Sequence, residues 1–143
     1  MSTRTAIFKE QENGTFKGIY CHHDGYLEGV GYTLLKHYQD PEKVKALLEL
    51  GDILSLGEFL APKKGQTHTL LDPTPNTSVA YHRDRGDNYD DVKPKEFTGN
   101  KPALKWRFQE YNYFFGLDKK WYLVIVHPGI EKLWMIELYN YLV

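Results

Sequence analysis

The dipeptide Asn13-Gly14 stands between two runs of β-forming residues, at residues 5–9 and 15–21. Asn and Gly both tolerate the left-handed backbone of a type I′ turn, which closes a tight antiparallel hairpin. Three aromatic and β-branched runs follow near the C-terminus, at residues 109–115, 121–126 and 132–138, with turn-forming residues between them. The pattern therefore predicts a sheet built mainly from an N-terminal hairpin and a C-terminal antiparallel meander.

Two helices are predicted after the hairpin. The first begins at Asp24 as a candidate N-cap and repeats apolar residues at helical spacing: Leu27, Val30, Leu34, Leu35 and Tyr38. Gly29 and Gly31 lie inside it, which indicates that another backbone or a ligand comes close. The second helix begins after Asp40 with Pro41 in its first turn and ends before Gly51.

The middle of the chain is predicted to be less regular. Residues 52–56 are expected to form one short helical turn, residues 61–76 a loop and residues 77–82 a central strand, before a polar loop that reaches about residue 102. Residues 103–108 are a candidate helical turn. Together these elements predict a single α+β domain over residues 1–143, with two to three short helices on one face of an antiparallel sheet.

The charge balance and the single cysteine exclude several classes. The 143-residue chain has 18 basic and 19 acidic residues, a formal net charge of −1, and one cysteine. Without a positive surplus, the counterion release that drives binding to bulk nucleic acid is missing. One cysteine forms no internal disulfide, which is typical of the reducing cytoplasm, and no apolar run approaches the ~20 residues of a membrane span. We therefore expect a cytoplasmic protein that binds neither bulk nucleic acid nor membranes.

The first candidate site lies where the hairpin passes into the first helix. A helix start offers unpaired N–H groups, and a glycine lets an anion approach them closely. We expect His22 to donate a hydrogen bond to the ligand, and Tyr20 and Tyr26 to stack on it. Asp24 and Gly25 would form the backbone corner. The alternative is that Asp24 only caps the helix and the histidines face water.

The second candidate site is the stretch Tyr81-His82-Arg83-Asp84-Arg85-Gly86. Along an extended chain, Arg83 and Arg85 project to one side, and two guanidinium groups at that spacing can hold one phosphate. Tyr81 and His82 would stack on or donate to the same ligand, with Asp84 beside them. The alternative is that both arginines only pair with neighbouring aspartates on the surface.

Catalytic and metal sites have weaker support. The histidines lack the spacing of a zinc site, and Cys21 lies in a β-rich run where a small core residue is usual. No catalytic residue, metal or cofactor is therefore predicted. A small hydrolase or transferase that uses His22, His82 or Asp84 as acid or base is kept as a second alternative.

Aromatic residues make up 15% of the chain and are dense in the C-terminal meander. Strand alternation places Tyr111, Tyr113 and Phe115 on one face and Phe114 on the other. Two aromatic faces are more than one core needs, which leaves room for a homo-oligomer or a host protein as partner. An inhibitor of a host protein that acts through this aromatic surface is therefore the first alternative function.

A family resemblance rests on five stretches: Ser-Thr-Arg at 2–4, Gly-Ile-Tyr-Cys-His-His-Asp-Gly-Tyr-Leu-Glu-Gly-Val-Gly at 18–31, Leu-Leu-Lys-His-Tyr at 34–38, Leu-Gly-Asp at 50–52 and Tyr-His-Arg-Asp-Arg-Gly at 81–86. They resemble a family of small proteins encoded by bacteriophages and by bacterial genomes that carry phage-derived genes. The likeness reaches from the N-terminus to about residue 90. It implies a phage-type accessory protein acting in the host cytoplasm, a class that includes inhibitors which sequester nucleotide defence signals.

The leading hypothesis from the sequence is a non-enzymatic binding protein of this type. Its ligand is expected to be a small, anionic, nucleotide-like molecule, held where the two polar segments converge. Phosphate would bind the arginines, and a base would stack on tyrosine.

Overall fold

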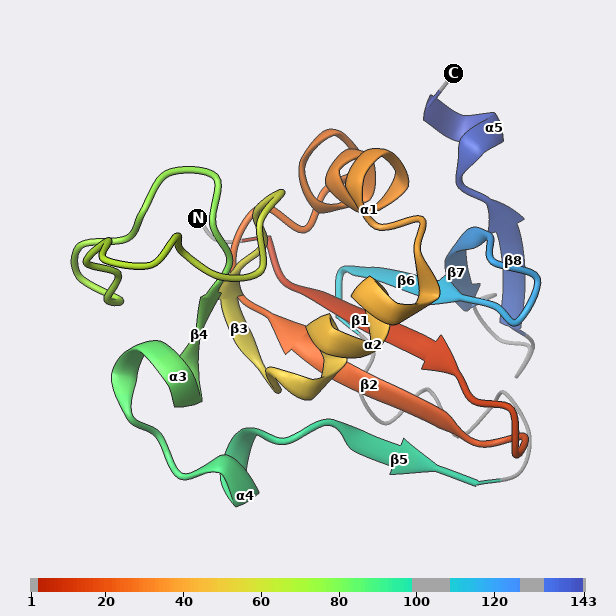
Figure 1. The fold of residues 1–143 in the computed structure, drawn as a ribbon. Helices are drawn as coiled ribbons and strands as arrows, with labels where there is room; N and C mark the ends of the chain where they lie inside the picture. Colours follow the sequence, from red (N-terminus) through yellow and green to blue (C-terminus); the bar gives the residue numbers. More distant parts are fainter. Residues whose placement is uncertain (1–2, 99–108, 127–132, 143) are drawn as a thin grey trace.

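The computed structural model describes residues 3–98, 109–126 and 133–142. These ranges form one eight-stranded mixed sheet with short helices, so the predicted α+β class is confirmed (Figure 1). The strands are β1 (Thr5–Glu10), β2 (Phe16–Cys21), β3 (Ile53–Ser55), β4 (Val79–Ala80), β5 (Lys95–Phe97), β6 (Tyr111–Phe115), β7 (Trp121–Val126) and β8 (Leu133–Glu137). The helices are the π-helical turn η1 (Leu27–Gly31), α1 (Tyr32–His37), α2 (Pro41–Glu49), α3 (Tyr81–Arg85), α4 (Tyr89–Val92) and α5 (Tyr139–Leu142).

The hairpin is at the centre of the sheet. The strand order is β4-β3-β2-β1-β6-β7-β8, with β5 also paired to β2. The hairpin β1–β2 and the meander β6–β7–β8 are antiparallel, as predicted. The pairings of β1 with β6 and of β2 with β3 are parallel. The sheet is therefore mostly, but not wholly, antiparallel, because the chain returns to both edges of the hairpin by crossover connections.

The hairpin turn is longer than the predicted type I′ turn. Gly14 donates its N–H to the carbonyl of Gln11, and Gln11 donates its N–H to the carbonyl of Thr15. In this pair of turn residues only Gly14 has a positive φ, of 85°. Asn13 instead uses its side-chain oxygen to accept from both the N–H and the hydroxyl of Thr15. Asn13 therefore stabilises the turn through its side chain, and not through the left-handed backbone conformation that a type I′ turn requires.

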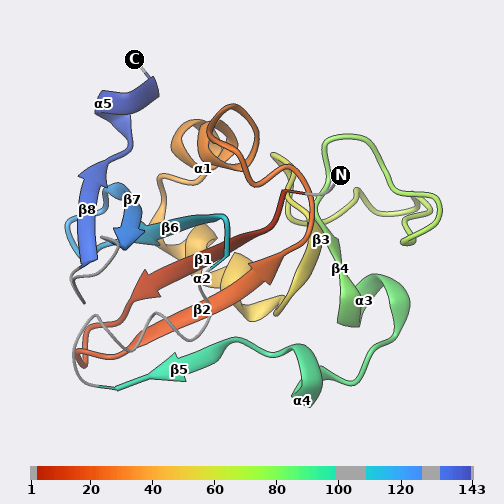
Figure 2. The same ribbon diagram turned by 180° about the vertical axis from the view of Figure 1, so that it is seen from behind.

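The helices α1 and α2 pack against the same face of the sheet. In Figure 2 strands β1 and β2 pass in front of α2, which lies on their far side. The Asp40 side chain accepts from the N–H of Glu42 and caps α2, as predicted. The buried apolar residues of η1, α1 and α2 join the sheet's inner residues in the main core: Val30, Leu34, Tyr38, Val44, Leu47 and Leu48, with Ile7, Ile19, Cys21 and Ile53.

The first helix begins differently from the prediction. Asp24 is not its N-cap: it has a φ of 58°, and the cap position is Tyr26, which makes no side-chain cap bond. The Asp24 carbonyl accepts from the N–H of Val30, which folds the chain tightly over η1. A Cβ at Gly29 would stand 2.3 Å from that carbonyl oxygen. The close approach inferred from the glycines is thus an approach of the protein's own backbone.

The middle of the chain also departs from the prediction. Residues 53–55 form β3 rather than a helical turn, because they pair with β2 and β4. The predicted strand at residues 77–82 is a strand only at Val79–Ala80, and α3 begins at Tyr81. Residues 61–76 form a loop, as expected. The candidate helical turn at residues 103–108 lies outside the described residues.

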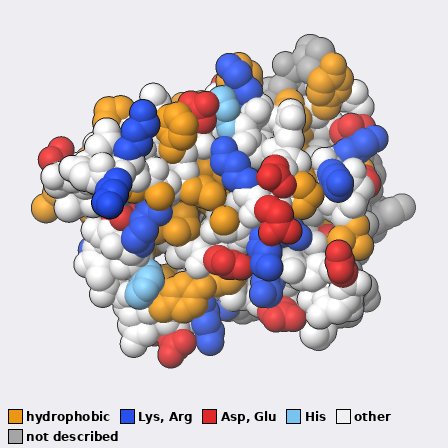
Figure 3. All heavy atoms as spheres, in the orientation of Figure 1, with side chains coloured by type: hydrophobic (Ala, Val, Ile, Leu, Met, Phe, Trp, Pro, Cys, Tyr) orange, Lys and Arg blue, Asp and Glu red, His pale blue; other side chains and the backbone are white. Residues whose placement is uncertain are grey.

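The aromatic side chains of β6 are buried on both faces of the sheet. Tyr113 and Phe115 belong to the main core, and Phe114 packs with Phe8 and Phe16 in a second cluster on the opposite face. Tyr113, Phe114 and Phe115 are therefore buried within the chain, whereas Tyr111 is half-buried. On the face that carries α1 and α2, basic and acidic side chains are interspersed (Figure 3).

Candidate functional site

Tyr20 and His22 form the first part of the site. Ile19 and Cys21 point into the main core, so strand alternation puts the Tyr20 side chain on the face opposite α1 and α2. The Tyr20 hydroxyl and Nδ1 of His22 are 2.7 Å apart and share one hydrogen bond. This bond fixes both rings and leaves Nε2 of His22 outside the pair.

Positive charge surrounds His22. Arg4 stands just beyond the register pair that joins Thr5 to Cys21, opposite His22, and the ring centroids of His22 and His23 are 4.7 Å apart. Burial lowers the pKa of His22, and the charges of His23 and Arg4 lower it further. Arg4 is exposed and has no ion-pair partner in residues 3–98, 109–126 and 133–142. A neutral imidazole therefore lies beside an unneutralised guanidinium.

Tyr81 comes to the same area because β3 lies between β2 and β4. Asp52, at the start of β3, joins the two segments. Its Oδ1 accepts from the N–H of Tyr20 at 2.9 Å, and its carbonyl accepts from the N–H of Tyr81 at 3.3 Å. Burial raises the pKa of Tyr81, and the neighbouring Tyr20 raises it further. Arg4, Tyr20, His22 and Tyr81 are called the tyrosine face below.

Arg85 lies against the edge of the tyrosine face. Its guanidinium carbon is 4.6 Å from the ring centroid of Tyr81. Its Nε and Nη2 each donate to one carboxylate oxygen of Asp87 at 2.6 Å, and these bonds lower the pKa of Asp87. His82 places Nδ1 2.7 Å from the Asp87 carbonyl oxygen. Because the Arg85 side chain is 50% exposed, an anion in solution can compete with Asp87 for it.

Arg83 does not join Arg85, which corrects the prediction of one two-arginine clamp. The two residues are in a helix, where positions two apart point in nearly opposite directions. Arg83 donates from Nη1 to the carbonyl of Leu60 at 2.6 Å and from Nη2 to the carbonyl of Ser78 at 2.8 Å. Its Nε donates to Asp84 Oδ1 at 2.9 Å. All three nitrogens of Arg83 are therefore used within the fold.

Asp84 and His68 complete this network, called the loop clasp (Arg83, Asp84 and His68). Their side chains are 4% and 2% exposed. Asp84 Oδ2 accepts from the N–H of Ala80 at 2.7 Å and lies 3.3 Å from Nε2 of His68. Nδ1 of His68 accepts from the N–H of Thr74, so the ring hydrogen is on Nε2, directed at Asp84 and the Ser78 carbonyl. Neither nitrogen of His68 is left for a ligand.

His68 was missed by the sequence analysis, and its partners explain why. They come from three separate places: Thr74 in the loop itself, Ser78 just before β4, and Asp84 in α3. A histidine among threonines and prolines carries no local signal of such contacts.

At the predicted ligand corner, residues 24–26, the backbone groups of Gly25 are hydrogen-bonded to other parts of the chain. The N–H of Gly25 donates to the carbonyl of Thr3 at 2.8 Å, and the hydroxyl of Tyr113 donates to the Gly25 carbonyl at 2.7 Å. Tyr26 and Asp24 are exposed, and Asp24 holds η1 through its carbonyl. The Gly25 amide therefore cannot assist a phosphate, contrary to expectation.

Asp84 and Cys21, two groups considered for catalysis, are both buried in the structure. Asp84 is enclosed in the loop clasp, and burial raises the pKa of the Cys21 thiol to about 12, so no thiolate forms near neutral pH. Within the described ranges no group of three or more His, Cys, Asp and Glu side chains could hold a metal ion. The helices found in those ranges are too short and too polar to cross a membrane.

An open cleft of about 470 Å³ lies elsewhere, between α1 and residues 73–77. His37 and Glu58, whose Nδ1 and Oε1 are 3.3 Å apart, are in its lining. None of the ten predicted site residues lines this cleft. The tyrosine face is thus separate from this cleft.

Comparison of the chain with protein-family models, with curated proteins and with solved structures finds no match. Any function must therefore be argued from the geometry.

We expect Arg83→Ala to lower the free energy of unfolding by about 3 kcal/mol, because it leaves the buried Asp84 carboxylate without its cation. Arg85→Ala is the matched control, since it removes an exposed pair from the same helix and should cost less than about 1 kcal/mol. Urea denaturation of both variants measures the difference. Equal losses would show that Arg83 is not a structural clasp.

The loop clasp also predicts a pH dependence. Burial alone would raise the pKa of Asp84, but the hydrogen bonds from Arg83 and the Ala80 N–H outweigh it and leave the pKa lowered. A carboxylate with a lowered folded pKa stabilises the fold above its unfolded pKa of about 3.9, and this contribution is lost as the pH falls. The stability gap between wild type and Asp84→Asn should therefore be largest near pH 7 and narrow below about pH 4. A gap that stays constant from pH 7 to pH 3 in urea titrations would contradict the assignment.

Proposed function

We propose that the protein binds a small, anionic, nucleotide-like molecule on the tyrosine face and holds it without chemical change. The observation that carries this proposal is the guanidinium of Arg4, which has no ion-pair partner among the described residues and lies beside His22 and the ring of Tyr20. Burial lowers the pKa of His22, and the positive charges of His23 and Arg4 lower it further. An anion bound there would offset the contribution of these charges.

The aromatic rings supply the second half of the recognition. Tyr20 and Tyr81 are both half-buried, held by Asp52 through their backbone N–H groups. The Tyr20 ring is held by its hydrogen bond to His22, and the Tyr81 ring lies against Arg85. Rings held by such contacts lose little entropy when a flat base stacks on them. One stacked base contributes about 1–3 kcal/mol, and a hydrogen bond to a charged group about 1.5–3 kcal/mol. Two or three such contacts support micromolar affinity after the cost of association.

Arg85 provides a second phosphate contact of different character. Its fork is filled by the Asp87 carboxylate in the structure, so a ligand phosphate must displace a single negative charge that belongs to the same chain. A phosphate monoester carries up to two negative charges near pH 7 and competes better than a carboxylate. This favours ligands with a terminal phosphate.

Binding without turnover is favoured by how the acid–base groups are used. Asp84 is held in the loop clasp, and Nδ1 of His82 and Nδ1 of His22 each have a partner within the chain. The resemblance to bacteriophage proteins supports a role in which the bound molecule is a host signalling nucleotide, sequestered in the host cytoplasm.

Isothermal titration of the full chain with AMP, ADP and a cyclic dinucleotide tests the proposal. We expect a micromolar dissociation constant for at least one of them, raised about tenfold by Arg4→Ala and by Tyr81→Ala, the loss of about 1.4 kcal/mol each. Tyr32→Ala, which removes an exposed tyrosine from α1, should change it less than about twofold. Absence of binding heat with all three ligands, or equal weakening by Tyr32→Ala, would refute the proposed site.

A further inference from the structure

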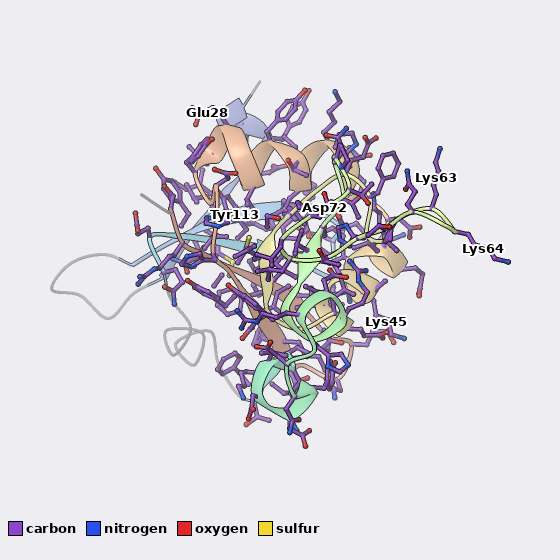
Figure 4. All side chains as sticks on the ribbon, turned by 90° about the vertical axis from the view of Figure 1, so that its left-hand side faces the viewer. Glu28, Lys45, Lys63, Lys64, Asp72 and Tyr113 are labelled. Carbon is purple, nitrogen blue, oxygen red and sulfur yellow. The ribbon has the colours of Figure 1, made fainter. Side chains whose placement is uncertain are left out.

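The open cleft between α1 and residues 73–77 has no part in the proposed nucleotide site. Its volume of about 470 Å³ falls within the range of small-molecule sites, about 300–1,000 Å³. In Figure 4 the labelled Asp72, which directly precedes one wall of the cleft, lies beneath α1, which forms the other wall. The cleft therefore has room for one small molecule.

The segment around Glu58 is tied to both walls of the cleft. Nζ of Lys43 donates to the carbonyl of His37, at the end of α1, and to the carbonyl of Glu58, each at 2.8 Å. On the other side, Phe59 donates its N–H to the carbonyl of Asn76 at 2.9 Å. The shape of the cleft is thus set before a ligand arrives, which reduces the entropy cost of binding.

A histidine and a carboxylate meet in the lining of this cleft. Nδ1 of His37 is 3.3 Å from Oε1 of Glu58, and the two side chains are 25% and 42% exposed. A carboxylate beside Nδ1 stabilises a hydrogen on that nitrogen, so the neutral ring keeps its lone pair on Nε2. Oε2 of Glu58 accepts from no group of residues 3–98, 109–126 and 133–142. The pair therefore offers two acceptors to a ligand.

Asn76 adds a group that both donates and accepts. The residue is exposed and has a left-handed backbone, with a φ of 59°. Its carbonyl binds the N–H of Phe59, whereas its side-chain amide has no hydrogen-bond partner in the part of the chain that the structure describes. The fold therefore uses the main chain of Asn76 and leaves the amide to a ligand in the cleft.

We propose that this cleft binds a neutral, hydroxyl-rich molecule of monosaccharide size. Sugar hydroxyls both donate and accept, so they match a set made of a carboxylate, an imidazole and an amide. Pro73 and Pro75 in one wall offer apolar surface to the C–H groups of a sugar ring.

The charges around the cleft favour a neutral ligand. A phosphate would lack a cation, because none of the described residues that line the cleft is a lysine or an arginine. An amine would meet the Lys43 ammonium, which is 2.8 Å from the Glu58 carbonyl oxygen and offsets the negative charge of that residue. Neither sign of charge on a ligand is therefore matched by the cleft.

Saturation-transfer NMR of the full chain with D-glucose, D-ribose and N-acetyl-D-glucosamine tests the proposal. We expect saturation transfer to at least one sugar, a millimolar dissociation constant, and shifts of the amide resonances of residues 55–58 and 73–77. Glu58→Gln and Asn76→Gly should each weaken binding about fivefold, through loss of a charged acceptor and of an amide. Glycine tolerates the left-handed backbone at position 76, so the second change removes the amide without strain.

Glu137→Gln and Lys119→Gly are the matched controls. Glu137 pairs with Lys120 at 3.7 Å on the surface, Lys119 is exposed with a φ of 64°, and neither Glu137 nor Lys119 lines the cleft. Each control should change the affinity less than about twofold. All four variants should keep the wild-type melting temperature, because none of these side chains is buried.

No saturation transfer to any of the three sugars, amide shifts confined to other segments, or equal weakening by the controls would overturn the proposal. Shifts at residues 55–58 and 73–77 with inorganic phosphate or putrescine, but not with the sugars, would assign the cleft to a charged ligand and overturn it as well. The sugars carry neither phosphate nor base, and no residue of the tyrosine face lines the cleft. A failure here therefore leaves the nucleotide proposal to its own titration.

Discussion

The pairing of the buried Asp84 carboxylate with the partly exposed Arg83 guanidinium fixes the geometry between α3, β4 and the loop at residues 61–76. Asp84 accepts from the N–H of Ala80 and meets His68, while Arg83 reaches the carbonyls on either side of this loop. The same contacts start α3 directly after β4. Breaking a buried pair costs far more than an exposed one, so this interaction fixes the geometry around it.

Because residues 81–85 are helical, Arg83 and Arg85 of the same short motif point in different directions and make different contacts. In α3, Arg83 turns toward the loop and Arg85 turns toward Tyr81. An extended chain would have aimed both guanidinium groups the same way. The motif that looks like a single phosphate clamp is therefore half structural and half a surface contact. Arg4, which was not among the predicted site residues, provides a guanidinium without an ion-pair partner in the described residues.

Local signals were sufficient for the hairpin and for α2, where Asp40 caps the helix and apolar spacing matches burial. They failed at residues 53–55, because β3 exists only through pairing with β2 and β4, which are distant in sequence. They failed again at Asp24, whose left-handed backbone follows from packing against Gly29. The sequence did indicate Tyr20, His22 and Tyr81 as site residues. Asp52, which accepts from the backbone N–H groups of Tyr20 and Tyr81, was not among the predicted site residues.

Two arginine side chains therefore have separate roles: Arg4 binds the ligand, and Arg83 holds the loop and α3 in place. Arginine Nε–H resonances report this directly, in a two-dimensional ¹H–¹⁵N NMR titration of the full chain with AMP. The account predicts that the Arg4 resonance moves progressively with AMP while that of Arg83 stays unchanged. A moving Arg83 resonance with a stationary Arg4 resonance would contradict it.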